Sequence, residues 1–197
     1  MSCTTNETDR ILVIGDSWAS AREADTGRDL GWSVCMNLPD GMRQGVSGST
    51  AEQWSVDFDG RLTRAQGTKA DTVIISLFGN DARGFISDRM ITVPEIAAGL
   101  RHMRIVMNAM LRPLTIVLLY ADPFSGTNDL SSITIPLING IIRRACRGLS
   151  VVYADIGMWL TRDHFDGRDI YPTRLGHAVI ASRLRDLIDA DTNKEME

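Results

Sequence analysis

The sequence predicts one α/β domain in which helices cover both faces of a parallel β-sheet. Short apolar runs bounded by turn residues alternate along the chain with segments of helical periodicity. The runs are rich in Val, Ile and Leu at consecutive positions, which is typical of strands buried on both faces of a parallel sheet. Because strands and helices alternate, we expect right-handed crossovers and a three-layer α/β/α sandwich.

The expected strands are, in chain order, ILVIG (11–15), TVIISLFG (72–79), LTIVLLYAD (114–122) and LSVVYAD (149–155). The expected helices cover residues 50–64, 93–111, 131–147 and 175–188. Thr50, followed three residues later by Gln53, has the pattern of a capping box at a helix start. Pro94 suits the first turn of the next helix. We therefore expect a flavodoxin-like sandwich with a central parallel sheet of about five strands.

The length of 197 residues fits one domain covering residues 1–197, and 44% hydrophobic residues can fill its core. The polar ends, residues 1–9 and 190–197, are expected to be flexible. The formal net charge is −4, with basic and acidic residues spread along the chain. Nucleic-acid binding is not expected, because it needs clustered Lys and Arg.

The N-terminus lacks the pattern of a signal peptide, and the apolar runs are far shorter than the roughly 18 residues of a membrane span. Cys3, Cys35 and Cys146 are far apart and odd in number, so we expect reduced thiols in a cytoplasmic protein and no metal site. The sequence contains no phosphate loop or dinucleotide fingerprint, and therefore no cofactor is expected. Nothing in it indicates the oligomeric state.

Polar residues follow the expected strands, at the sheet edge where such folds bind ligands. The first strand leads into Gly-Asp-Ser, with Ser17 at the turn, and the second ends in Gly-Asn-Asp, which contains Asn80. Between them lies a Gly/Ser-rich turn around Gly48. The backbone N–H groups of Ser17 and Gly48 and the amide of Asn80 can converge on one point. Three such donors would form an oxyanion hole.

Each of these residues also has a plain structural explanation. Ser17 could be a helix N-cap, Gly48 a turn residue and Asn80 part of an Asx turn. The order of the motifs and their joint placement after strands or at helix starts favour the functional interpretation.

The order GDS, Gly/Ser turn, GND and a late Pro before the last helix resembles the SGNH (GDSL-type) hydrolase family over residues 11 to about 185. The resemblance implies that Ser17 is the nucleophile of an ester hydrolase. It also implies that the Ser17 N–H, the Gly48 N–H and the Asn80 side chain bind the oxyanion. In this family a late Asp-x-x-His supplies the base and the third member of the triad.

The sequence departs from the family pattern in RDIYPTRLGH (168–177). Pro172 and Gly176 are kept, but Tyr171 stands where the family has histidine. Counting back three positions from Tyr171 gives Arg168, and Asp169 is only two positions back. Since a tyrosine hydroxyl ordinarily titrates near pH 10, it is a weak base at neutral pH.

Three histidines are possible substitutes for the missing base. His164 lies in a polar loop seven residues before Tyr171, where Asp169 and other carboxylates could orient it. His177 lies in the first turn of the last helix, and His102 lies in the middle of a helix, where a structural role is expected. His164 can equally be a surface residue.

Three functions follow from the motifs. The first is hydrolysis of a small acyl ester, such as an acetyl ester or acylated sugar, through a Ser17 acyl-enzyme. The second is a pseudoenzyme that keeps the pocket for binding, because Tyr171 replaces the histidine. The third is acyl transfer. The expected partner is a small ester or acylated sugar, with no nucleic acid and no membrane. Trp18, Trp54, Phe78 and Phe85 can line its pocket or belong to the core.

Overall fold

Five parallel strands form the central sheet, in the order β2-β1-β3-β6-β7. This is the strand order of flavodoxin-like folds, and the predicted fold class is confirmed. The strands are β1 (Ile11–Gly15), β2 (Arg43–Gly45), β3 (Thr72–Ser76), β6 (Leu114–Leu119) and β7 (Val152–Asp155). The computed structural model describes residues 10–20, 31–81, 86–87, 90–91, 93–121, 131–165 and 171–194.

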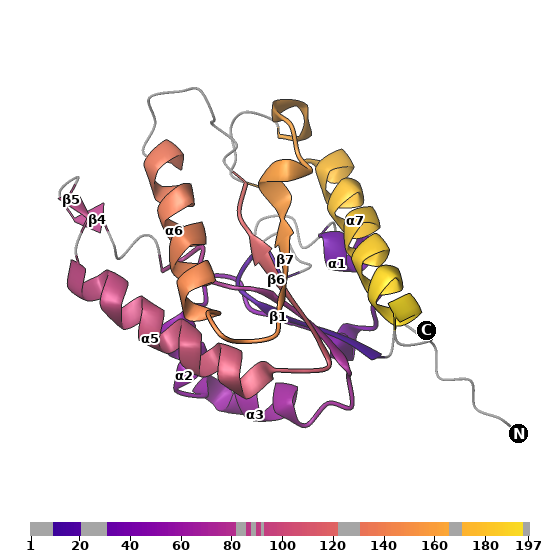
Figure 1. The fold of residues 1–197 in the computed structure, drawn as a ribbon, viewed down its shortest axis with the longest axis horizontal. Helices are drawn as coiled ribbons and strands as arrows, with labels where there is room; N and C mark the ends of the chain where they lie inside the picture. Colours follow the sequence, from indigo (N-terminus) through magenta and orange to yellow (C-terminus); the bar gives the residue numbers. More distant parts are fainter. Residues whose placement is uncertain are drawn as a thin grey trace, which may run out of the picture.

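Helices cover both faces of the sheet, which makes the three layers (Figure 1). On one face α2 (Ala51–Ser55), α3 (Arg61–Gln66) and α6 (Ser131–Ala145) all contact α5 (Val93–Met110). On the other face α1 (Trp32–Cys35) contacts α7 (Arg174–Lys194). A small antiparallel pair, β4 (Ile86–Ser87) and β5 (Met90–Ile91), precedes α5.

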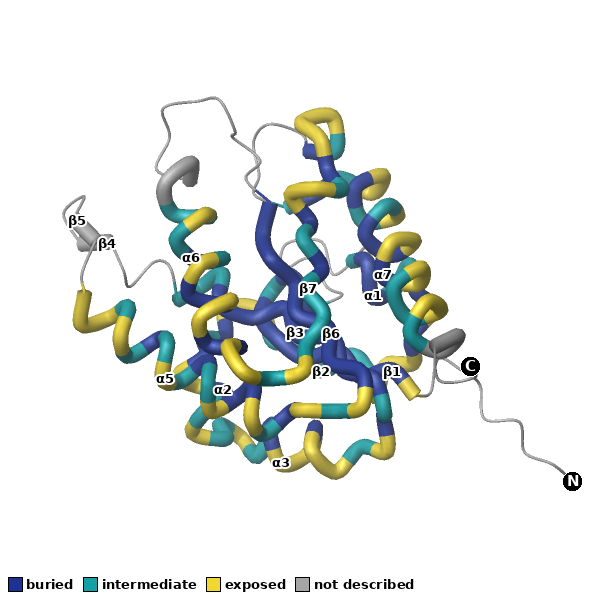
Figure 2. Tube along the Cα trace, viewed as in Figure 1, coloured by how far each residue is buried: buried dark blue, intermediate teal, exposed yellow. Residues whose placement is uncertain are grey.

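The central strands form the middle of the core, shown in dark blue in Figure 2. Every residue of β1, β3 and β6 is buried, whereas the edge strands β2 and β7 are largely half-buried. Helices on both sides remove the central strands from water, which explains their unbroken apolar sequences. The largest side chains with no exposed surface, Trp32, Trp54 and Phe78, pack around this sheet.

The single helix expected over residues 50–64 is interrupted in the structure. The capping box predicted at its start is present, since Thr50 and Gln53 exchange side-chain and backbone hydrogen bonds. The helix ends at Ser55, however, and Asp57 and Gly60 adopt left-handed backbone angles before α3 begins. The Asp57 carboxylate accepts hydrogen bonds from the backbone N–H and hydroxyl of Thr63, which stabilises the break. A 3-10 turn, Phe58–Gly60, fills the gap.

Strand β2 was not among the strands predicted from the sequence, because its residues do not form a hydrophobic run. Its three residues are half-buried, and it joins the sheet through parallel pairing of Arg43 with Val13 and of Gly45 with Gly15. Gly45 packs closely against the chain, because a Cβ atom there would lie 2.4 Å from the backbone N of Ser20.

The last helix is longer than predicted and includes residues 190–194 of the tail expected to be flexible. Residues 1–9 and 195–197 lie outside the described residues, as does Cys3. Cys35 and Cys146 are free thiols. None of the helices in the described part of the chain has the length and apolar character needed to span a bilayer.

Candidate active site

Ser17 lies in the turn that follows β1, at the carboxyl edge of the sheet. The turn begins at Gly15, whose φ of +144° is rarely adopted by other residues. A Cβ atom at Gly15 would lie 1.8 Å from the carbonyl oxygen of Ser76 in β3. The Asp16 N–H donates to that same carbonyl over 2.9 Å. The close approach of β1 to β3 therefore determines where the half-buried Ser17 is presented.

Tyr171 lies next to Ser17, although the two residues are 154 positions apart. Its phenolic hydroxyl donates to Ser17 Oγ over 2.5 Å. The Tyr171 ring packs against Trp18, with ring centroids 5.9 Å apart. Pro172, the next residue, pairs with Phe165 in an isolated antiparallel bridge. These contacts hold the phenol at the serine hydroxyl.

The Gly48 turn and Asn80 are joined through Ser49. Gly48 has a φ of +78°, and the Ser49 N–H donates to the carbonyl of Val46, as in a type II turn. The Asn80 side-chain amide donates to the Ser49 carbonyl over 3.0 Å. The Ser49 hydroxyl in turn donates to the carbonyl of Gly15 over 3.1 Å. The two predicted oxyanion donors are thereby connected to the end of β1.

Asp16, which immediately precedes Ser17, is completely buried. Its Oδ1 accepts the Trp18 N–H over 2.9 Å, and its Oδ2 accepts the Gly79 N–H over 2.9 Å and the Tyr120 hydroxyl over 2.8 Å. Burial raises the pKa of Asp16 to about 6, although these hydrogen bonds act in the opposite direction. One carboxylate thus connects the turn of Ser17 with the segment that carries Asn80.

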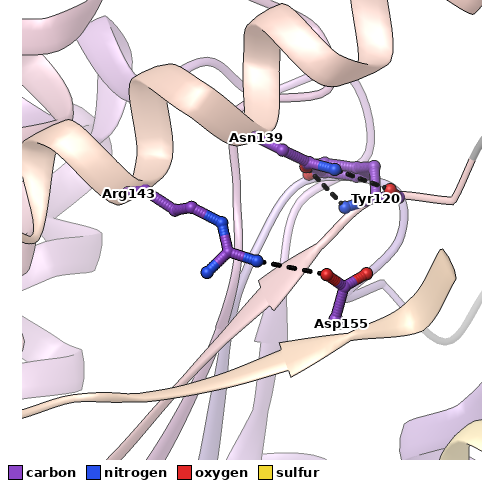
Figure 3. A network of polar contacts seen from close by, with 4 residues as sticks. All are labelled: Tyr120, Asn139, Arg143 and Asp155. Atoms are coloured by element: carbon purple, nitrogen blue, oxygen red, sulfur yellow. Dashed lines mark hydrogen bonds and ion pairs between the residues drawn. The ribbon is translucent and has the colours of Figure 1, made fainter. Parts of the chain in front are cut away.

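Tyr120 follows β6, and hydrogen bonds fix both its backbone and its hydroxyl. Its backbone N–H and carbonyl are bonded to the Asn139 side chain of α6, over 2.8 and 2.9 Å (Figure 3). One helical turn further along α6, Arg143 pairs with Asp155 of β7 over 3.1 Å (Figure 3). Burial, followed by the adjacent Asp16 carboxylate, raises the pKa of Tyr120 well above its ordinary value. The phenol is therefore a protonated donor to Asp16.

Asp81 is a second buried carboxylate in this region. Both of its oxygens accept the Ala51 N–H, over 3.1 Å, at the start of α2. Burial raises the pKa of Asp81 to about 6, and the nearby Asp16 carboxylate acts in the same direction. Asp81 also lines a pocket of about 190 Å³, whose lining residues are Thr50, Glu52, Asn80, Asp81, Glu95, Ala98, Gly99 and His102.

The raised pKa of Asp81 predicts that the contribution of this carboxyl group to stability falls as the pH rises. For Asp81 the folded pKa of about 6 exceeds the ordinary value of 3.8, so folding favours the neutral form. This contribution is complete below pH 3.8 and is lost as the pH rises through about 6. It amounts to about 3 kcal/mol for a shift of this size.

Asp81→Asn is expected to reduce the loss of stability between pH 4 and pH 8 by about 2 kcal/mol, because its side chain stays neutral. Urea unfolding of the variant and the wild type at the two pH values measures this difference. Asp40→Asn is the matched control, since the Asp40 side chain is 93% exposed. A loss of equal size in Asp81→Asn and the wild type would contradict the prediction.

Two of the three histidines considered as substitute bases have side-chain contacts with other residues. His164 Nδ1 lies 2.9 Å from the Thr161 N and 3.0 Å from its hydroxyl, within a capping box. His102 Nδ1 lies 2.8 Å from the hydroxyl of Ser55. His177 lies in the first turn of α7, where its backbone N–H donates to the Thr173 carbonyl, a helical hydrogen bond that does not involve the imidazole. Among the described residues no His, Cys, Asp and Glu side chains gather in a group that could hold a metal ion.

Some predicted site residues fall outside the structure's described residues, namely Asp169, Phe85 and the loop 122–129. Of the aromatic residues expected to line the pocket or the core, Trp18 contacts Tyr171, and Trp54 is fully buried. Sequence reasoning missed Asp16 and Tyr120 as part of the site. The available signal was an acidic residue directly after a fully buried strand, where a charge needs partners.

The comparisons with known proteins agree with this architecture. A model of the GDSL-like Lipase/Acylhydrolase family matches residues 13–179. An alpha/beta hydrolase enzyme from the metagenome of Lake Arreo, Spain, is similar in structure, with a TM-score of 0.65 and 16% identity, covering 88% of this chain and 92% of that chain. An acetylxylan esterase from Geobacillus stearothermophilus has a TM-score of 0.64 and 16% identity, covering 88% and 91%. Catalytic mutants of that esterase replace a serine and a histidine by alanine. No curated protein sequence matches the chain.

The family match extends from β1 into α7 and covers most of the chain. It includes the Ser17 turn, the Gly48 turn, Asn80 and Tyr171. The resemblance to SGNH (GDSL-type) hydrolases is confirmed, and the chain belongs to the GDSL-like lipase/acylhydrolase family.

Proposed function

We propose that the protein is a serine ester hydrolase that acts on a small acyl ester, acetyl esters among them. The observation that carries the proposal is the position of Ser17, at the carboxyl end of β1 with the Tyr171 hydroxyl 2.5 Å away. Ser17 Oγ attacks the ester carbonyl, the ester C–O bond breaks, and the alcohol leaves. Water then hydrolyses the acyl-enzyme and releases the acid.

The oxyanion is stabilised by the N–H groups of Ser17 and Gly48 and by the amide of Asn80. An asparagine amide has two N–H donors. In Asn80 one of them bonds to the Ser49 carbonyl, which orients the amide and leaves the other for the substrate. Each donor aimed at a developing oxyanion is worth about 10²–10³ in rate. Gly48 is exposed in its turn, so a substrate can approach its backbone.

Tyr171 is the base in this proposal, and it acts in its ionised form. As a neutral phenol it hydrogen-bonds to Ser17 Oγ but does not take up the serine proton, and so does not activate the serine. As a phenolate it accepts the Ser17 proton and passes it to the departing alcohol, and it then takes a proton from the attacking water and returns it to Ser17 Oγ. Because a phenol ordinarily titrates near pH 10, hydrolysis is slow at neutral pH and accelerates toward alkaline pH.

The substrate is a neutral or weakly charged ester. The pocket beside Asn80 is lined by three carboxylates, Glu52, Asp81 and Glu95. Like charges repel, so an anionic group is disfavoured there, whereas alcohol hydroxyl groups can donate hydrogen bonds to carboxylates. The structural similarity to an acetylxylan esterase is consistent with an acylated sugar.

A second candidate is a pseudoenzyme that binds an ester or glycan without turnover. The contact between the Tyr171 and Ser17 hydroxyls favours it, because a neutral phenol beside Ser17 Oγ is a weak base for the serine proton. The two candidates differ in whether hydrolysis depends on Ser17.

Ser17→Ala is expected to abolish the hydrolysis of p-nitrophenyl acetate above the rate of buffer alone, because it removes the nucleophile. Ser182→Ala is the matched control, since Ser182 is an exposed residue of α7. It is expected to leave kcat/KM unchanged. Labelling by a fluorophosphonate at pH 9 checks the same serine independently of turnover. Equal hydrolysis by Ser17→Ala and the wild type would refute the acyl-enzyme, and its absence from both, without labelling, would favour the pseudoenzyme.

A further inference from the structure

We propose that Asp16 is a positioning residue, whose carboxylate holds the turn from Phe78 to Asn80 in the conformation that presents the oxyanion donor. The inference rests on the proposed function for its catalytic consequence. The structural part of it holds independently of turnover. Asp16 itself has no exposed surface, and its carboxylate is hydrogen-bonded within the protein. It therefore acts through the turn and not on the substrate.

The carboxylate of Asp16 bridges two segments that are far apart in the sequence. Oδ1 accepts the N–H of Trp18, on the other side of Ser17. Oδ2 accepts the N–H of Gly79, the residue before Asn80, over 2.9 Å. The distance between the serine turn and the asparagine turn therefore depends on one side chain.

The turn that Asp16 holds is strained. Phe78 has a φ of +113°, a value that residues with a Cβ atom rarely adopt, and it is fully buried. Strain of this kind persists only where surrounding contacts compensate for it. The N–H that follows Phe78 is the one that donates to Asp16, so this hydrogen bond supports the strained angle directly. Gly79 also leaves little room for a side chain, because a Cβ atom there would lie 3.0 Å from Asp16 Oδ2.

Tyr120 completes the arrangement. Its hydroxyl donates to Asp16 Oδ2 over 2.8 Å and accepts the Gly79 N–H over 3.1 Å. The Asn139 side chain fixes the backbone of Tyr120 at both its N–H and its carbonyl, as Figure 3 shows. Asp16 therefore accepts hydrogen bonds from three donors. A protonated carboxyl group would carry a donor of its own on one oxygen, so the charged form suits this arrangement.

Protonation of Asp16 weakens this support in mildly acidic solution. Burial brings its pKa to about 6. The titratable groups that face it are the Tyr120 hydroxyl, which lowers that pKa, and the Asp81 carboxylate, which is close enough to interact. Since Asp81 also titrates at about pH 6, a variant must separate the two carboxyl groups.

The backbone N–H of Gly79 reports the proposed contact without any need for activity. In ¹⁵N-labelled wild-type protein its chemical shift is expected to titrate with a midpoint near pH 6, and Asp16→Asn is expected to abolish that titration. Asp81→Asn is the matched control, because Asp81 bonds to Ala51 and not to Gly79. It is expected to keep the titration. A Gly79 shift that is flat in the wild type, or that titrates in Asp16→Asn but not in Asp81→Asn, would overturn the proposal.

Activity provides the second measurement. Asp16→Asn is expected to lower kcat for p-nitrophenyl acetate about 10²-fold with KM little changed, the size of losing one oxyanion donor. In the wild type the slope of log(kcat/KM) against pH is expected to steepen from about one to about two below pH ~6. The slope in Asp16→Asn should stay near one, which a merely structural role would not produce.

Tyr120→Phe keeps the test decisive if Asp16→Asn does not fold. It removes one donor to the carboxylate, so the Gly79 midpoint is expected to move to higher pH. An unmoved midpoint would overturn the proposal. If no variant and no wild type hydrolyses esters, the proposed function fails, while the Gly79 titration still decides the role of Asp16.

Discussion

Replacing Tyr171 by histidine is expected to raise kcat/KM for p-nitrophenyl acetate at pH 7 about 10²-fold. The phenol donates to Ser17 Oγ over 2.5 Å, so the position is already within hydrogen-bond reach of the nucleophile. An imidazole ordinarily titrates near pH 6.5, so it accepts the serine proton at neutral pH, which a neutral phenol does not. General-base assistance of this kind contributes about 10²–10⁴ in rate. The pH dependence should also change, from a rise toward alkaline pH to a plateau above pH ~7.

Tyr171→Phe is the matched control for that variant. It removes the hydroxyl and keeps the ring that packs on Trp18, so it separates the loss of proton transfer from the loss of packing. We expect Tyr171→Phe to be less active than the wild type at pH 9 and to lose the alkaline rise. If Tyr171→His were no more active at pH 7 than Tyr171→Phe, this position would not be the base position.

Gly15→Ala is expected to lower the free energy of unfolding by about 4 kcal/mol or more, an effect at the upper end for a single substitution. The added Cβ would lie 1.8 Å from the Ser76 carbonyl oxygen, far inside contact distance. The backbone of β3 cannot move away easily, because it is paired with β6 on its other side. The φ of +144° adds strain of its own. Urea denaturation followed by circular dichroism measures the change.

Gly140→Ala is the matched control for the same substitution elsewhere. Gly140 is an exposed residue of α6, and a Cβ atom there meets nothing within 4 Å. Alanine is the better helix former, so stability is expected to rise by about 0.5–1 kcal/mol. A similar, small effect at both glycines would mean that the close approach of β1 and β3 does not limit the Gly15 turn.

The layers of the fold could be predicted because burial on both faces leaves a direct mark on the sequence. Each residue of β1, β3 and β6 is buried, and each of these strands was visible as an apolar run. Strand β2 lacks that mark, because its half-buried RQG segment carries no apolar side chain. The break between α2 and α3 was missed for a related reason. It depends on the left-handed angles of Asp57 and Gly60 inside an otherwise helical pattern.

The candidate site divides in the same way. Motif order predicts that Ser17 and Tyr171 come together, since one follows the first strand and the other precedes the last helix. The roles assigned to them stay predictions. The sequence could not predict the hydrogen bond between Tyr171 and Ser17 or the contacts of Asp16, because both depend on how side chains are rotated within a packed core. Asp169 lies outside the described residues, and its role stays a prediction.

The separation of Ser17 and Tyr171 along the chain also has a consequence for how the protein folds. Their hydrogen bond joins residues 154 positions apart in the chain. The chain must therefore lose the conformational entropy of this long loop before the contact can form. The segment carrying Tyr171 follows β7, which lies at one edge of the sheet and pairs with β6. Contacts of such long range form slowly in refolding. During renaturation, Ser17 reactivity should therefore recover after the secondary structure, which makes it a reporter of the last step of assembly.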